Sequence, residues 1–124
     1  FDLNFGPYPS SMTQRPEDIS AEDAAGTMLE AGHRMWQGPN RITAADWEGW
    51  VEQRGSKFLV KWDERYEPMI ESRDTGQAPQ RGIWLEARHG KGSYAYCALA
   101  WYRQLPFAVP GAVRIFANLV SGGR

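Results

Sequence analysis

Four acidic residues close together in the chain are the first candidates for chemistry. They are Asp63, Glu64, Glu67 and Glu71. Most glycoside hydrolases place two carboxyl groups on either side of the bond they cleave, so the cluster is compatible with a small carbohydrate-active hydrolase. Its catalytic candidates are Asp63, Glu64 and Glu67. Charges around a loop are more often simply solvated, and the hydrolase therefore stays an alternative to a non-catalytic protein.

Aromatic side chains are a second candidate, because their faces stack on the apolar faces of sugar rings. The chain has 6 Trp, 5 Tyr and 5 Phe among 124 residues. Aromatic residues in a small protein also fill its core, so each position has two interpretations. The aromatic candidates for sugar binding are Trp36, Trp62, Tyr66, Trp84 and Trp101. We expect Trp84 to be the most exposed of them.

The other reactive residues do not indicate a metal site, a nucleophile or a phosphate loop. A metal site needs several converging donors, and besides its acids the chain offers His33, His89 and Cys97. Cys97 lies in an apolar run without a strand-to-helix turn or a neighbouring base, which is typical of a core residue. The segment 90–92 joins two expected strands and is therefore interpreted as a hairpin turn. We expect no metal and no cofactor.

Composition limits the classes of partner. The 14 Lys and Arg against 15 Asp and Glu give a net charge of −1, which removes the electrostatic argument for binding nucleic acid or an anionic membrane. No run of 18 apolar residues indicates a membrane span, and the first residues do not resemble a signal peptide. We expect one soluble domain. Its compartment stays open, since an export signal outside the given sequence is compatible with it.

The clearest helix start lies near the middle of the chain. Thr43 is a cap residue with Asp46 three positions later, and Trp47 and Trp50 follow at the spacing of one helical face. These signals predict a helix over 44–54 with its tryptophans turned inward.

The flanking segments predict strands and an irregular beginning. Residues 57–62 alternate in a way that indicates a half-buried strand, and 66–72 predicts a strand weakened by Pro68. Turn residues predict a loop over 74–79. Residues 1–30 are predicted to form an irregular arm, with a short helix from about Ser20 or a strand from about Thr27.

The last third of the chain predicts an antiparallel hairpin followed by a helix. The strand 82–88 places Ile83, Leu85 and Ala87 on one face and Trp84, Glu86 and Arg88 on a wetter one. A glycine turn leads into the apolar run 93–101. Pro110 then precedes a helix over 111–121 that ends at Gly122. The apolar stripe predicted to pack on the sheet comprises Val113, Phe116, Ala117 and Val120.

Two stretches of the sequence resemble a known family. They are 40–55 and 90–119, which include Arg41-Ile42-Thr43, Glu48-Gly49-Trp50-Val51, Gly90-Lys91-Gly92-Ser93-Tyr94, Tyr102-Arg103-Gln104-Leu105-Pro106 and Phe116-Ala117-Asn118-Leu119. The chain resembles the carboxy-terminal part of the class I glutamine-amidotransferase-like domain found in bacterial proteins of the PIG-L (LmbE-like) deacetylase family. More distantly it is similar to ThuA-like (trehalose utilisation) proteins.

The resemblance implies an α/β fold derived from a three-layer parent domain. As an isolated fragment we expect α+β structure, with an antiparallel hairpin and additional strands packed by two helices. The arm 1–30 then precedes an amidotransferase-like subdomain over 31–124. A sheet that lacks part of its parent exposes a strand edge, which predicts a homodimer.

The resemblance also implies a function without catalysis in this chain. Neither the deacetylase's zinc-binding motif nor the amidotransferase nucleophile is present. We therefore expect a non-catalytic accessory or carbohydrate-binding fragment of a bacterial protein, acting in the cytoplasm or exported, with a sugar or glycan as ligand. Arg103 and Gln104 join Trp62, Tyr66, Trp84 and Trp101 as candidate contacts. The alternatives are the small hydrolase and a purely structural or oligomerisation domain.

Overall fold

The computed structural model describes residues 6–12, 19, 25–52 and 54–124. Its strands are β1 (Ser10–Ser11), β2 (Ala25–Met28), β3 (Lys61–Trp62), β4 (Glu67–Pro68), β5 (Ile70–Arg73), β6 (Trp84–His89) and β7 (Gly92–Cys97). The helices are the 3₁₀ turns η1 (Arg34–Trp36) and η2 (Ala44–Trp47) and the α-helices α1 (Trp101–Gln104) and α2 (Pro110–Ser121). The strands pair as β1-β3, β2-β5 and β4-β6-β7, all antiparallel, so the described chain has α+β architecture.

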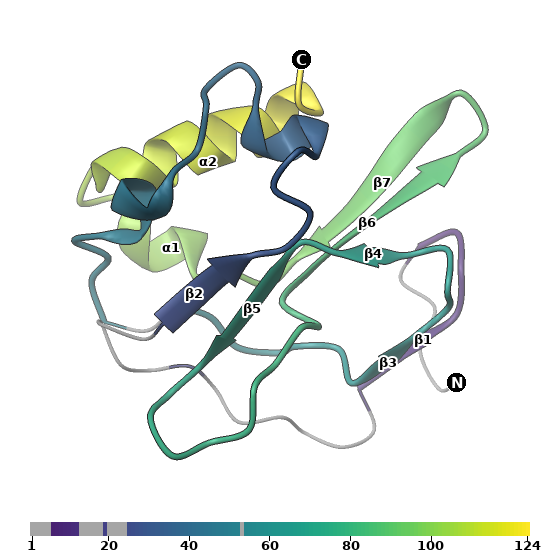
Figure 1. Ribbon diagram of the computed structural model, residues 1–124, viewed down its shortest axis with the longest axis horizontal. Helices are drawn as coiled ribbons and strands as arrows, with labels where there is room; N and C mark the ends of the chain where they lie inside the picture. The colour runs from purple at the N-terminus through teal and green to yellow at the C-terminus, as the bar shows by residue number, and fades with distance from the viewer. Residues whose placement is uncertain (1–5, 13–18, 20–24, 53) are drawn as a thin grey trace.

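The predicted hairpin is confirmed. Strand β6 pairs with β7 from Trp84 opposite Cys97 to His89 opposite Gly92. Gly90 has a φ of 59°, a left-handed conformation that glycine adopts without steric cost, which explains the turn at this point. Figure 1 shows the hairpin extending away from α1 and α2, which lie together on the other side of the molecule.

The terminal helix is confirmed, but its predicted packing face is wrong. Pro110 occupies the first turn and Gly122 ends the helix with a φ of 66°. The side that is buried carries Gly111, Ala112, Ile115 and Asn118, of which only Ile115 is a large apolar residue. Val113 and Val120 of the predicted stripe are 46% and 67% exposed. Glycine is required at 111 because the helix backbone lies directly against the backbone of Asp46. A Cβ on Gly111 would lie 1.7 Å from the Asp46 carbonyl oxygen.

The predicted helix over 44–54 is also wrong, since regular structure ends at Trp47. Its start is as predicted, because the backbone N–H of Thr43 donates to Asp46 Oδ2 at 2.9 Å. Continuing the helix would require the Trp50 backbone N–H to bond the Asp46 carbonyl. The Trp50 indole takes that carbonyl instead, with Nε1 at 2.9 Å. The inward position of both tryptophans, Trp47 and Trp50, is confirmed.

The two strand predictions between 57 and 72 are only partly correct. In the first segment only β3 forms, and the predicted alternation is wrong because Phe58 and Leu59 are both buried. The second segment splits into β4 and β5, which belong to different sheets. Met69 is the junction: its N–H donates to the Trp84 carbonyl and its own carbonyl accepts from Leu29, both at 2.9 Å. The loop over 74–79 is confirmed.

The described parts of the first 30 residues pack against the rest of the chain. Strand β1 pairs with β3, and β2 pairs with β5, which confirms the strand alternative near Thr27. Ile19 is buried and its N–H donates to the Gly55 carbonyl at 3.1 Å. The alternative helix starting at Ser20 falls mainly on 20–24, outside the described residues.

Strand β6 separates two apolar clusters. On the tryptophan side, buried residues include Trp36, Trp47, Trp50, Trp84 and Ile115. On the tyrosine side, Leu59, Tyr66, Leu85 and Ala87 are buried, and Tyr8, Met12, Trp62, Tyr94 and Tyr96 pack around them while half-buried. The predicted wetter face of β6 is therefore wrong, because Trp84 is 0% and Glu86 2% exposed. Both faces are covered, so alternation cannot indicate which one meets water. Within the described ranges, none of the helices has the length and apolar character that crossing a bilayer requires.

Candidate functional site

Three of the predicted ligand contacts are buried and serve the core. Tyr66, Trp84 and Gln104 are each at most 5% exposed. The Gln104 amide braces a neighbouring loop: its Oε1 accepts from the Val51 N–H at 2.8 Å and its Nε2 donates to the Val51 carbonyl at 2.9 Å. The expectation that Trp84 is exposed is wrong.

Two further predicted contacts lie near α1, away from Trp62. The Trp101 ring packs between Trp50 and Phe116, with centroid distances of 5.9 and 5.4 Å. Arg103 forms an ion pair with Glu52 at 2.7 Å. The structure therefore does not bring the six predicted contacts into one site.

Trp62 is different, because it is half-buried and forms the wall of a pocket. This Trp62 pocket has a volume of about 310 Å³ and is lined by Leu59, Val60, Trp62, Pro79, Gln80, Arg81 and Gly82. Strand β3 positions the indole by pairing Trp62 with Ser10. The opposite wall is held by close backbone packing, since a Cβ on Gly82 would lie 1.7 Å from the Leu59 carbonyl oxygen. The pocket thus brings the aromatic residue Trp62 together with the polar residues Gln80 and Arg81 from a distant segment of the chain.

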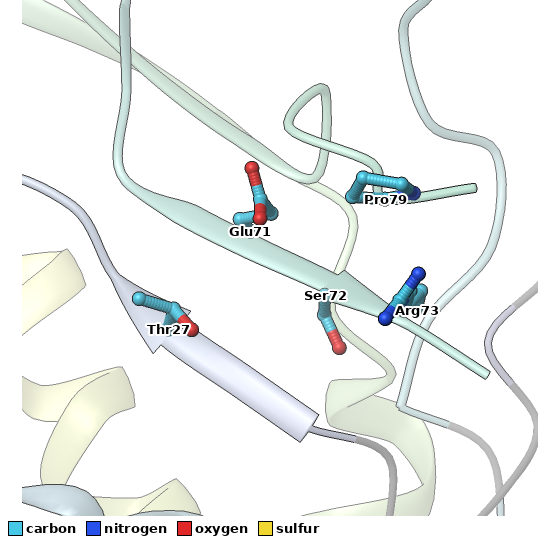
Figure 2. A pocket seen from close by; sticks show the side chains of 5 residues that line it. All are labelled: Thr27, Glu71, Ser72, Arg73 and Pro79. Atoms are coloured by element: carbon cyan, nitrogen blue, oxygen red, sulfur yellow. The ribbon is translucent and has the colours of Figure 1, made fainter. Parts of the chain in front are cut away.

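A second pocket, of about 300 Å³, lies on the other side of Pro79. Figure 2 shows its lining: Thr27 from β2, Glu71, Ser72 and Arg73 from β5, and Pro79. The two pockets share Pro79, and an ion pair between Arg81 Nε and Glu71 Oε2 at 2.6 Å links their walls. This pairing neutralises the two charges locally. The Trp62 pocket is therefore polar with little net charge, while Arg73 adds a positive charge to the second pocket.

The three catalytic candidates of the hydrolase alternative lie outside these two pockets. Arg65 chelates Asp63 with Nε at 2.7 Å and Nη2 at 2.9 Å, and these hydrogen bonds lower the pKa of the Asp63 carboxyl to about 2. Glu64 is exposed. Glu67 is also exposed, and its Oε2 lies 3.9 Å from His33 Nε2.

Glu86 is a buried carboxylate that was not among the predicted site residues, because its position on β6 was expected to face solvent. Glu86 accepts from Trp84 Nε1 at 2.9 Å and from Arg34 Nη2 at 3.3 Å. Burial raises the pKa of the Glu86 carboxyl. Burial, and to a lesser extent the positive charge of Arg34, lowers the pKa of His33. Arg34 Nε also donates to the Gly122 carbonyl at 3.0 Å, so this ion pair fastens the end of α2 to the sheet.

Gln80 and Arg81 were also missed as pocket residues. Their signal was the pair of opposite charges, Glu71 and Arg81, on either side of the predicted loop 74–79. Ser72 and Gln80 close that loop through backbone hydrogen bonds of 3.0 and 2.9 Å, as in a hairpin. Treating the loop as a hairpin would have placed Arg81 beside Glu71.

The described part of the chain contains neither a cluster of metal ligands nor a thiol with a lowered pKa. Across 6–12, 19, 25–52 and 54–124, no group of three or more His, Cys, Asp or Glu side chains could hold a metal ion. Burial raises the pKa of the Cys97 thiol to about 12, so this thiol stays protonated at neutral pH.

Comparisons of the chain with protein-family models, curated proteins and solved structures gave no match.

Proposed function

We propose that this chain is a non-catalytic carbohydrate-binding unit and that the Trp62 pocket is its sugar site. The observation that carries the proposal is the half-exposed Trp62 indole beside Gln80 and Arg81 in a pocket of about 310 Å³. An accessory role, related to the three-layer amidotransferase-like domain of PIG-L family proteins, is what the sequence resemblance over 90–119 implies.

The chemistry of the pocket suits a sugar. The apolar face of a pyranose stacks on an indole, while amide and guanidinium groups hydrogen-bond the hydroxyls at the ring edge. The ion pair of Arg81 with Glu71 balances the charge of both, which favours a neutral sugar over an anionic one. The second pocket beyond Pro79 lets a ligand of more than one sugar unit continue past Thr27.

Binding is favoured over hydrolysis by the carboxyl groups present. A glycoside hydrolase needs two of them on opposite sides of the scissile bond. Among the residues that line the two pockets, Glu71 is the only carboxylate, and it is engaged by Arg81. The pockets therefore hold one of the two groups that hydrolysis requires.

The test is a titration of the chain with neutral monosaccharides and oligosaccharides, followed by tryptophan fluorescence and by NMR of the indole N–H groups. We expect one indole resonance to shift, and Trp62→Ala to remove that resonance and weaken binding about tenfold or more, as loss of a stacked ring does. Arg81→Ala should weaken binding through lost hydrogen bonds.

The matched control is Tyr102→Ala, which removes an aromatic ring that is 61% exposed and lies outside the pocket. Its affinity should equal that of the unmodified chain. Circular dichroism of each variant separates loss of binding from loss of fold. The proposal is rejected if no sugar of the panel shifts an indole resonance, or if Tyr102→Ala weakens binding as much as Trp62→Ala does.

A further inference from the structure

Strand β7 is an outer strand of the three-stranded sheet. The strand order is β4-β6-β7, so β6 occupies one side of β7. Among the described residues, no strand pairs with the other side of β7. Beyond Cys97 the chain pairs with the segment 54–56, because Ser56 N–H donates to the Ala98 carbonyl at 3.3 Å and Ala100 N–H to the Arg54 carbonyl at 2.7 Å.

The hydrogen-bond pattern identifies the backbone groups on this edge. Ala98 N–H donates to the Ile83 carbonyl at 2.8 Å, and bonded pairs alternate along an antiparallel ladder. The pairs of Leu85 with Tyr96 and of Ala87 with Tyr94 therefore exchange bonds within the hairpin. Ser93 and Ala95 direct their N–H and C=O groups to the open side, where they can pair with another strand.

The two outer strands of the sheet differ in how they are protected from further pairing. Proteins usually block an edge with charges, a proline or a very short strand. Strand β4 has all three features, since it consists of Glu67 and Pro68 alone. Strand β7 has 6 residues, Gly-Ser-Tyr-Ala-Tyr-Cys, with neither charge nor proline. Figure 1 shows its hairpin projecting from the body of the molecule, which leaves room beside it.

We infer that β7 pairs antiparallel with β7 of a second copy of this chain, forming one continuous sheet across a two-fold axis at Tyr94. In this register Ser93 lies opposite the partner's Ala95, and both such pairs exchange two backbone hydrogen bonds. Tyr94 faces its own counterpart, and Tyr96 lies over the partner's Gly92. Because the strand carries no charge, self-pairing places no like charges opposite each other.

The decisive variant is Ala95→Pro, examined by sedimentation equilibrium at about 100 µM chain, a concentration that detects weak association. Proline removes the outward N–H and fills the edge with its ring, while the bonds of Tyr94 and Tyr96 to β6 remain. The unmodified chain should sediment at twice its mass of 14.0 kDa, and the variant as a monomer. Ser93→Lys, which adds an edge charge, should also weaken the dimer.

Ala44→Pro is the matched control, because Ala44 is exposed and begins η2, a position that tolerates proline. This variant should remain dimeric. Circular dichroism and thermal unfolding confirm that each monomeric variant is folded; if Ala95→Pro fails this check, Ser93→Lys decides. A monomeric unmodified chain, or a folded Ala95→Pro chain that still sediments as a dimer, overturns the inference.

Discussion

The two faces of β6, the tryptophan side and the tyrosine side, are both covered by aromatic residues, but the residues pack differently on each. On the tryptophan side, Trp84 stacks edge-on against Trp36 at 5.1 Å between ring centroids, and helix α2 approaches to backbone contact at Gly111. On the tyrosine side, the Tyr66 ring is buried, the rings around it are half-buried, and tyrosine hydroxyls donate to backbone carbonyls. Tyr66 donates to the Tyr8 carbonyl at 3.1 Å and Tyr8 donates to the Arg88 carbonyl at 2.8 Å.

The difference shows where adaptable surface lies in this small domain. Buried tryptophans and backbone contacts leave the tryptophan side no freedom to admit a ligand, because well-packed interiors do not deform at low cost. The tyrosine side keeps ring edges and hydroxyls near solvent. The Trp62 pocket borders this side, and the tyrosines of the proposed dimer edge belong to it. Three pairs of variants, each with one substitution on either side of β6, test this comparison.

The largest effect is expected from truncating a tryptophan on each side. Trp84→Ala removes a side chain that is 0% exposed and takes away a hydrogen bond to Glu86, and should cost about 3–5 kcal/mol in free energy of unfolding. Trp62→Ala, at a half-buried position, should cost about 1–2 kcal/mol, because less area returns to water. Urea unfolding followed by circular dichroism measures both. Equal costs would mean that the two sides are equally well packed.

A smaller contrast is expected from adding one methyl group to a glycine on each side. In Gly111→Ala the new Cβ would meet the Asp46 backbone, which cannot move without displacing α2, and the cost should be about 3 kcal/mol. In Gly6→Ala it would meet the Tyr94 ring at 2.5 Å, and that half-buried ring can shift, so about 1 kcal/mol or less is expected. Thermal unfolding of the two variants measures the difference. A Gly6→Ala cost as large as that of Gly111→Ala would show that the tyrosine side is rigid.

The smallest effect concerns pH, and the two sides should respond with opposite sign. Burial raises the pKa of Glu86 above its ordinary 4.5, so the folded state holds this proton more tightly than the unfolded state. This group should therefore lower stability as pH rises from about 4.5 through its raised pKa. On the tyrosine side, Arg65 lowers the pKa of Asp63 from 3.8 to about 2, which adds stability above pH 3.8 that is lost as pH falls toward 2.

The measurement is urea unfolding between pH 2 and 8 for the unmodified chain, Glu86→Gln and Asp63→Asn. Glu86→Gln should remove the decline above pH 4.5, and Asp63→Asn the loss below pH 3.8. Burial lowers the pKa of His33 below its ordinary 6.5. Stability should therefore rise as pH increases from this lowered pKa to 6.5, and both variants should keep this rise. Because the Arg65 side chain that pairs with Asp63 is 57% exposed, salt should weaken the contribution of Asp63 more than that of the buried Glu86. Profiles unchanged by Glu86→Gln would contradict the assignment.

Sequence reasoning succeeded where the signal was local. The hairpin turn at Gly90 and the ends of α2 at Pro110 and Gly122 were predicted, because the backbone freedom of glycine and proline depends on the residue itself. The capping contact at Asp46 was predicted because it joins residues only three positions apart in the sequence. For the candidate site, Trp62 was identified as an aromatic platform, but its neighbours were not.

The remaining features depend on residues that are far apart in the sequence. The close approach of Gly111 to Asp46 selects which face of α2 is buried. The meeting of Trp62 with Arg81 across the pocket follows from the packing of Gly82 on Leu59. The sequence by itself determined where the chain turns and where its last helix begins and ends, because those choices are steric properties of single residues. Only the tertiary structure decided which faces are buried and which side chains share a pocket, because burial is set by what packs from elsewhere in the chain.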